Sequence, residues 1–289
     1  MKREQKYGLR SLEKDFPNEE AVLTYIFNIR HSKKCSCGGT YSLKKGRRQF
    51  QCSKCRFQIA PMAGTIFHKS STPLMVWLKA ILIFSNAKSG ISAKELERQL
   101  EVTYKTAWRI LMLIRKSLKQ NSYLQGLVEM DEAYFGGKKG YKDARHRPSF
   151  VGNKAVVMGA VERGGKVTAK KMSDATAKSI TRFLDHHINP MDTKLYTDKS
   201  NRYVKSAWGY ERETVNHSKK EYVRGEAHIN TVESFWAHIK RSVSGTHKVV
   251  SKKYLQSYLD GFVFHYNNRY SDKARFQALL GMILSYSKS

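Results

Sequence analysis

All four cysteines of the chain lie between residues 35 and 55, and this clustering constrains the fold of that segment more than any other feature. They form two close pairs, Cys35 with Cys37 and Cys52 with Cys55, with 14 residues between the pairs. Four thiolates at this spacing can meet as the corners of a tetrahedron around one zinc ion. The segment has few apolar residues and would hardly fold without a metal. We therefore predict a zinc ribbon over residues 31–70.

The ligand set of this site is left open by the spacing of the first pair. Cys35 and Cys37 are separated by one residue, where two are more common, so His31 or His68 is an alternative to one thiolate. Four reduced thiols without a metal are the other interpretation, which the spacing disfavours. A disulfide framework is not expected from four cysteines gathered in one short segment.

The chain is strongly basic, with 53 Lys and Arg against 24 Asp and Glu and a formal net charge of +29. A protein of this charge usually binds a polyanion such as nucleic acid. A ribosome-associated protein, or a basic surface without a single partner, is the alternative. The 289 residues are enough for one large domain and one or two small modules, and a hydrophobic content of 40% allows a real core.

No membrane partner is expected. The longest apolar run, Ala80 to Phe84, is far shorter than the roughly 20 residues of a membrane span. The basic N-terminal residues are not followed by the apolar stretch of a signal peptide. These observations predict a cytoplasmic, nucleoid-associated protein.

Two further modules are expected before residue 123. Residues 1–30 have the apolar pattern of a short helical lead-in. In residues 71–122, two helices with hydroxyl N-cap candidates are joined by a tight turn, which predicts a helix-turn-helix. Trp108 of the second helix is expected in the core, with stacking on DNA as the alternative. Base edges are usually contacted by the start of that helix, whose candidate DNA contacts are Thr103, Tyr104, Lys105 and Arg109.

Strand patterns begin after residue 122. Residues 127–131, 155–161 and 166–172 are strand-like, and a helix over about 175–187 precedes a short strand at 194–197. Further helices follow, one of them with an apolar stripe from His228 to Val243. This order of elements predicts a mixed α/β sheet, and residues 123–289 are assigned to a single α/β domain.

Three acids in this domain form a candidate metal site. Asp131 and Asp198 each end a predicted strand, where side chains can converge at one rim of a sheet, although either alone would more often be a turn or capping residue. Glu233 lies beside the apolar stripe of its helix, where a carboxylate is costly unless it is paired or metal-bound. A salt bridge to Lys240 or Arg241 is the alternative for Glu233. Together the three acids make a ligand set for two divalent ions.

The sequence around these acids resembles known transposases. Asp131, Asp198 and Glu233, the last after 34 intervening residues, look like the DDE triad of transposases and retroviral integrases, which share the ribonuclease H-like fold. The surrounding motifs closely resemble ISXO-like insertion-sequence transposases, a group with an N-terminal zinc ribbon. These motifs are DEAYFGG (131–137), VNHS (215–218), HINTVESFW (228–236), KR (240–241), GTIF (64–67), YLQSYL (254–259) and YN (266–267).

The resemblance implies a transposase that cuts the ends of its own mobile element and joins the freed 3′-hydroxyl ends to target DNA. It implies two Mg²⁺ or Mn²⁺ ions per active site beside one structural zinc, with double-stranded DNA as the partner. Pairing two element ends implies a homodimer or a higher oligomer. Residues 123–289 would then be a ribonuclease H-like catalytic domain behind the zinc ribbon and the helix-turn-helix.

The third catalytic position is either Glu or Asn in this group, and the chain offers both Glu233 and Asn230. Chemistry favours Glu233, because a carboxylate neutralises metal charge and an amide does not. Lys240 resembles the basic residue that follows the third ligand, and Arg241 beside it is a further candidate DNA contact. Gly261 after Asp260 departs from the group, where a second acid is expected.

A basic loop after the first strand is placed to follow a phosphate backbone, although a solvated loop is the alternative for each residue. Its candidate contacts are Lys138, Lys139, Arg145 and Arg147.

Two other functions are weighed against transposition. A non-catalytic DNA-binding regulator would leave the three acids without a shared purpose, and a two-metal DNA nuclease would use the same triad.

Overall fold

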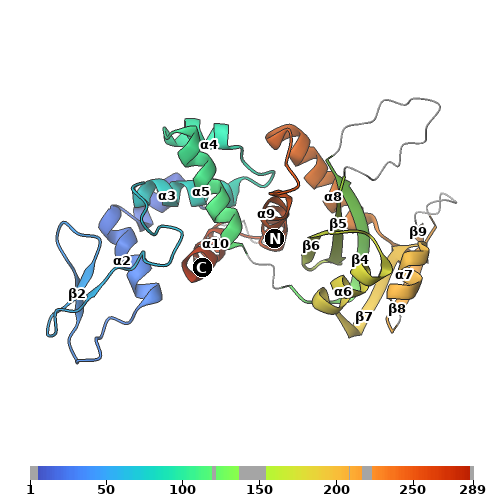
Figure 1. Cartoon of the computed structure of the whole chain (residues 1–289), viewed down its shortest axis with the longest axis horizontal. Coiled ribbons are helices and arrows are strands. Elements are labelled where there is room, and N and C mark those ends of the chain that lie inside the picture. The colour runs from blue at the N-terminus through green and yellow to red at the C-terminus, as the bar shows by residue number, and fades with distance from the viewer. Residues whose placement is uncertain (1–5, 119–121, 137–153, 208, 217–222, 287–289) are drawn as a thin grey trace. The chain divides into compact units, whose positions relative to one another are not determined.

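The computed structural model describes residues 6–118, 122–136, 154–207, 209–216 and 223–286. The chain divides into two compact units, Met1–Lys119 with Asn268–Ser289, and Gln120–Asn267 (Figure 1). None of the helices in these described segments is long and apolar enough to cross a membrane.

The first unit joins a small antiparallel sheet, in the order β1-β2-β3, to a group of helices. Phe27 of the second helix stacks on Phe50 of the central strand, with ring centroids 4.0 Å apart, so the sheet is attached to the helices by an aromatic contact. The elements are α1 (Leu9–Asp15), α2 (Glu19–Arg30), β1 (Tyr41–Leu43), β2 (Phe50–Cys52), β3 (Gln58–Ile59), α3 (Leu74–Asn86), α4 (Ala93–Leu100), α5 (Tyr104–Ser117) and α10 (Asp272–Ser285).

The predicted helix-turn-helix corresponds to α4 and α5. The Ser92 hydroxyl accepts a hydrogen bond from the Glu95 amide, and the Thr103 hydroxyl accepts one from the Thr106 amide, so both helices begin at hydroxyl N-caps. Between them Glu101 has a left-handed backbone that ends α4 and turns the chain.

The C-terminal helix lies in the first unit, although the sequence assigned residues 123–289 to one domain. The Arg275 side chain of α10 is buried and its Nε donates to the Ser85 carbonyl of α3 over 2.6 Å. Phe276 of α10 packs on Tyr7, with ring centroids 5.1 Å apart. The apolar residues of α10 recur at helical spacing, which predicts a buried face but does not identify the helices that bury it.

The second unit contains a five-stranded sheet in the order β6-β5-β4-β7-β8. β4 pairs antiparallel with β5, and β5 with β6, whereas β4 with β7 and β7 with β8 are parallel. The order of elements in the sequence predicted such a mixed sheet. The elements are β4 (Leu124–Phe135), β5 (Ala155–Glu162), β6 (Val167–Met172), α6 (Ala177–His187), β7 (Ile188–Asp198), α7 (Asn201–Ser206), β8 (Glu211–Val215), β9 (Val223–Arg224), β10 (Ala227–His228), α8 (Asn230–Ser242), the π-helical turn η2 (Val243–His247) and α9 (Leu255–Asn267).

Both faces of this sheet are covered by helices (Figure 1). Met130, Met158 and Leu195 belong to a core that includes the apolar residues of α6. Ala133 of β4 and Tyr196 of β7 belong to the other core, which includes those of α8 and α9. Because side chains alternate along a strand, the odd-numbered residues of β4 face α8, and so do Tyr196 and Asp198 near the end of β7.

Gly159 of β5 makes the close approach of α8 possible. It lies opposite Asp131 on β4 and on the face covered by α8. A Cβ atom at this position would lie 2.4 Å from Cζ2 of the Trp236 ring, closer than non-bonded atoms approach. The glycine therefore sets the height of α8 above the sheet beside the candidate acids.

We expect Gly159→Ala to destabilise the protein by about 1–3 kcal/mol, the usual cost of inserting a methyl group into a filled core. Urea unfolding followed by circular dichroism measures the change. Gly245→Ala is the matched control, since a Cβ atom there meets nothing within 4 Å. Equal stability of the Gly159→Ala variant and the wild type would show that Trp236 does not hold α8 at this height.

Candidate functional site

Asp131 and Asp198 lie side by side on neighbouring parallel strands. Glu129 of β4 is in register with Tyr196 of β7, and each aspartate comes two residues later on its own strand. Both aspartates therefore face α8 and reach the same level of the sheet. Asp198 ends β7 as predicted, but β4 continues to Phe135, because residues beyond Asp131 still pair with β5.

The electrostatics of Asp131 reflect a group of like charges. Its pKa is raised to about 7, first by burial and then by the charge of the adjacent Glu132, with Asp198 and Glu233 contributing in the same direction. The Oδ1 atom of Asp198 is buried and accepts no hydrogen bond within the described residues. Carboxylates that repel one another, one with an unsatisfied buried oxygen, have the donor chemistry that suits divalent cations.

Glu233 approaches these aspartates from α8. It lies in the first turn of the helix, one turn after Asn230, and both side chains are exposed. Of the two, only Glu233 carries a charge that acts on Asp131. In the described parts of the chain, the three carboxylates do not form a ligand group as tight as the cysteines.

Lys240 lies further along α8 on an exposed position, followed by the exposed Arg241. Lys240 lines a cavity of about 560 Å³ together with Tyr134 at the end of β4 and Lys248 after η2. Positive charge therefore borders the strand that carries Asp131.

Glu132 was not singled out from the sequence as a site residue. Its side chain, on the opposite face from Asp131, pairs with Arg202 and accepts a hydrogen bond from the Tyr203 hydroxyl, both from α7. Because α7 follows β7 directly after Asp198, this contact ties the segments that carry both aspartates. The one sequence signal was its place beside Asp131 in the DEAYFGG motif.

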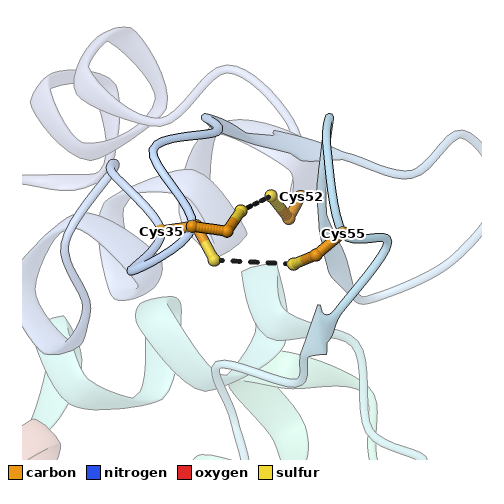
Figure 2. Close-up of side chains that lie close together, drawn as sticks. Cys35, Cys52 and Cys55 are labelled. Atoms are coloured by element: carbon orange, nitrogen blue, oxygen red, sulfur yellow. Dashed lines mark hydrogen bonds between the residues drawn. The ribbon is translucent and has the colours of Figure 1, made fainter.

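The four cysteine thiols converge in the first unit. Cys35 Sγ lies 3.7 Å from Cys55 Sγ, and Cys37 Sγ lies 3.4 Å from Cys52 Sγ. All four sulfurs lie within 4.8 Å of one another, and Figure 2 shows the labelled thiols pointing toward one another. Sulfurs at the corners of a tetrahedral zinc site are about 3.8 Å apart, so the group fits one metal ion. Neither His31 nor His68 belongs to this ligand group.

Local backbone and hydrogen bonding prepare this thiol group. A hydrogen bond from the Tyr41 hydroxyl lowers the pKa of Cys35 to about 6, which favours the metal-binding thiolate. Gly38 has a φ of +77°, and a Cβ atom on Gly39 would lie 2.6 Å from the Cys52 sulfur. The two glycines therefore turn the chain closely around the thiols.

The candidate DNA contacts of the helix-turn-helix lie along the start of α5. Thr103, Tyr104 and Lys105 are exposed and Arg109 is half-buried. Trp108 is 38% exposed on the same helix, so the expectation that it packs in the core was wrong. Lys138, Lys139, Arg145 and Arg147 lie outside the described residues.

The raised pKa of Asp131 predicts a stability that depends on pH. In the unfolded chain this carboxyl titrates near pH 4, so the folded protein binds its proton more tightly. The contribution of Asp131 to the free energy of unfolding is therefore fully present below about pH 4, and it is lost as the pH rises through about 7. Asp131→Asn removes this loss, and we expect its stability relative to wild type to improve by about 2 kcal/mol between about pH 5 and pH 8.

Urea unfolding at both pH values, without added divalent ion or chelator, measures this difference. Asp185→Asn, at an exposed acid of α6, is the control. A difference between the Asp131→Asn variant and wild type that stays constant with pH would contradict the electrostatic description.

Comparison with known proteins places this chain in a family. The family model for an ISXO2-like transposase domain matches residues 123–267, which is half of the chain. An uncharacterized protein in transposable element ISH50 of Halobacterium salinarum is 28% identical over 270 residues, covering 86% of this chain and 91% of the relative.

Solved structures show more distant similarity. A chain of the Mos1 strand transfer complex is 15% identical, with a TM-score of 0.32 over 73% of this chain and 77% of its own. A chain of a simian T-cell lymphotropic virus intasome is 12% identical, with a TM-score of 0.28 over 56% of this chain and 59% of its own.

The family match extends over the whole sheet and the three acids, and it ends where the second unit ends. The chain therefore belongs to the ISXO2-like transposases and is an enzyme that cleaves and joins DNA.

Proposed function

We propose that this transposase binds the ends of an insertion sequence, cleaves them and joins their 3′-hydroxyl ends to target DNA. Asp131, Asp198 and Glu233 are the ligands of two divalent ions, Mg²⁺ or Mn²⁺. The observation that carries this proposal is the electrostatic group around Asp131, whose pKa is raised to about 7 by burial and neighbouring acids, Asp198 and Glu233 among them. Acids that repel one another in a buried position are a common feature of functional sites, and a divalent cation compensates for their charge.

The residues of the chain provide a rigid frame for this chemistry. When bound, the two metal ions would activate the attacking oxygen and stabilise the leaving oxygen of a phosphodiester. Asp131 and Asp198 stand on adjacent strands of a sheet covered on both faces, so their carboxylates are held at a defined separation. Glu233 completes the set from α8, where Trp236 one turn later packs on Gly159.

Glu233 is favoured over Asn230 as the third ligand. Its negative charge acts on Asp131, so it belongs to the same electrostatic group. A neutral amide at Asn230 contributes an oxygen but no charge to offset a divalent cation. Asn230, exposed at the start of α8, remains in reach of a scissile phosphate.

Basic and N-terminal elements bind the DNA. Lys240 and Lys248 line the cavity at the end of β4, and Arg241 follows Lys240 on α8. In the first unit, the exposed start of α5 contacts base edges of the element end. The net charge of +29 supports affinity through many phosphate contacts. Two element ends have to be paired, so the active form is a homodimer or a higher oligomer.

One zinc ion is bound by Cys35, Cys37, Cys52 and Cys55. Sulfur is the donor that zinc prefers in structural sites, and the thiol separations match a tetrahedral site. The short β1-β2-β3 sheet buries little apolar surface, so the metal supplies most of its stability.

Removing any one of the three acids should abolish strand cleavage. Ala at Asp131, Asp198 or Glu233 is expected to reduce cleavage of an end-containing duplex in Mg²⁺ by at least about 1,000-fold, because a metal ligand is lost. Binding of the duplex should be retained or improved, because a charge that repels phosphate has gone. Cleavage gels and a binding assay without divalent ion measure the two quantities.

Asn230→Ala is the matched variant and should do less harm than Glu233→Ala. If the Glu233→Ala variant cleaves DNA and the Asn230→Ala variant does not, the third metal ligand is Asn230 and not Glu233. Cleavage without joining to target DNA by the wild-type protein would identify a nuclease instead, and binding without either reaction would identify a regulator.

Metal analysis tests the cysteine site. The purified protein should contain about one zinc per chain, and Cys52→Ala should lose it together with affinity for element ends, because the ribbon unfolds. Ser36→Ala, at an exposed position between two of the ligands, is the control and should keep its zinc. Wild-type protein prepared without chelator and free of zinc would overturn this assignment.

A further inference from the structure

Glu129 is a buried acid that the proposed reaction does not use. It lies on β4 two residues before Asp131, and its side chain is 0% exposed. A carboxylate without access to water is costly unless its oxygens accept several hydrogen bonds. The partners of Glu129 therefore indicate why the chain keeps an acid at this position.

Both carboxylate oxygens of Glu129 hold the start of α8. Oε2 accepts hydrogen bonds from the Thr231 amide over 2.7 Å and from the Val232 amide over 3.1 Å. Oε1 accepts one from the Thr231 hydroxyl over 2.9 Å. The N-cap residue of α8, Ile229, provides no side-chain hydrogen bond, so Glu129 on the sheet caps the helix instead. A negative charge at a helix N-terminus is also favoured by the helix dipole.

Arg163, which follows β5, connects Glu129 to the neighbouring strand β7. Its Nε donates to Glu129 Oε1 over 2.7 Å, and its Nη2 donates to the His228 carbonyl over 3.0 Å. The guanidinium lies 4.2 Å from the centre of the Tyr196 ring on β7. His228 Nδ1 lies 3.0 Å from the same Glu129 oxygen. The Glu129–Arg163 pair thus touches β4, β7 and the residues that enter α8.

Each proposed metal ligand follows one of these contacts by two residues. Asp131 follows Glu129 on β4, Asp198 follows Tyr196 on β7, and Glu233 follows Thr231 on α8. On the strands, two residues later means the same face at the next level of the sheet. One buried ion pair therefore touches all three segments immediately before their acids.

We propose that Glu129, together with Arg163, is a positioning residue that sets the separation of the three acids by fastening α8 to β4 and β7. This inference rests on the proposed function, in which the acids bind metal. Without the pair, α8 could shift along the sheet and carry Glu233 away from Asp131 and Asp198. Outer contacts that orient metal ligands typically change metal affinity or activity by about 10–100-fold.

Mn²⁺ binding to the full-length, zinc-loaded protein tests the proposal. The electron paramagnetic resonance signal of free Mn²⁺ gives the affinity without requiring activity. Glu129→Gln keeps the side-chain volume but replaces one accepting oxygen with a donor, which opposes the amides or the guanidinium. We expect Mn²⁺ affinity to fall roughly 10- to 100-fold, while affinity for an element-end duplex without Mn²⁺ stays unchanged.

A second variant covers the case in which Glu129→Gln does not fold. Arg163→Lys keeps the charge, but an ammonium cannot donate to Glu129 and His228 in the fixed directions of a guanidinium. It should weaken Mn²⁺ binding by several-fold. Ile180→Ala is the control for general loss of stability, since Ile180 is buried in the core on the opposite face of the sheet. That variant should bind Mn²⁺ as wild type does.

The outcomes separate this proposal from the proposed function. Unchanged Mn²⁺ affinity in a folded Glu129→Gln or Arg163→Lys variant, or an equal loss in Ile180→Ala, would overturn the positioning role. Asp131→Asn, measured in parallel, should lose Mn²⁺ binding if the acids are the metal ligands. Retained binding in Asp131→Asn would refute the metal site itself, whatever the Glu129 variants show.

Discussion

The catalytic unit depends on a charge that is completely withdrawn from water. Burial of the Glu129 carboxylate would oppose folding if the surrounding chain did not supply donors for both oxygens. Those donors come from β5–β6, through Arg163, and from the first turn of α8, which lie about 34 and 102 residues away in the sequence. Folding of the sheet and docking of α8 are therefore coupled, because neither segment alone can satisfy the acid. Trp236 on Gly159 adds an apolar contact at the next turn.

This frame holds acids that would otherwise separate. Burial and neighbouring carboxylates raise the pKa of Asp131, which means that the folded protein confines negative charge at this rim. An exposed or loosely held cluster would relax the repulsion by moving its side chains. Here two of the acids stand on hydrogen-bonded parallel strands, and the relief available to them is a proton or a cation. Repulsion between the carboxylates lowers the stability of the fold, and such a cost is usual at functional sites.

The two units solve the problem of folding in different ways. The second unit buries apolar side chains on both faces of its sheet, in two cores separated by the strands. The small sheet of the first unit has strands of two or three residues, and its thiol group stands where a hydrophobic core would otherwise be needed. The helices of the same unit are completed by α10 from the far end of the chain, which packs on α2, α3 and α5.

Local features of the chain were determined by the sequence alone. The paired cysteines, the hydroxyl caps at Ser92 and Thr103, and the strands that carry Asp131 and Asp198 all follow from short-range spacing, because turns, caps and side-chain alternation are decided within a few residues. The motifs around the acids indicated the family. The distinction between Glu233 and Asn230 rests on charge and was also open to argument from the sequence.

Only the tertiary structure decided the features that join distant segments. Glu129 appeared as one polar residue in an apolar strand, and its partners could not be identified because nothing local connects it to Arg163 or Thr231. The sequence shows Gly159 only as a glycine within a strand, and its close contact with Trp236 is visible only in the folded structure. The exposure of Trp108 and the return of α10 to the first unit were missed for the same reason. An apolar or amphipathic pattern states that a side chain can be buried, but the partner that buries it is chosen by the packing of the whole chain.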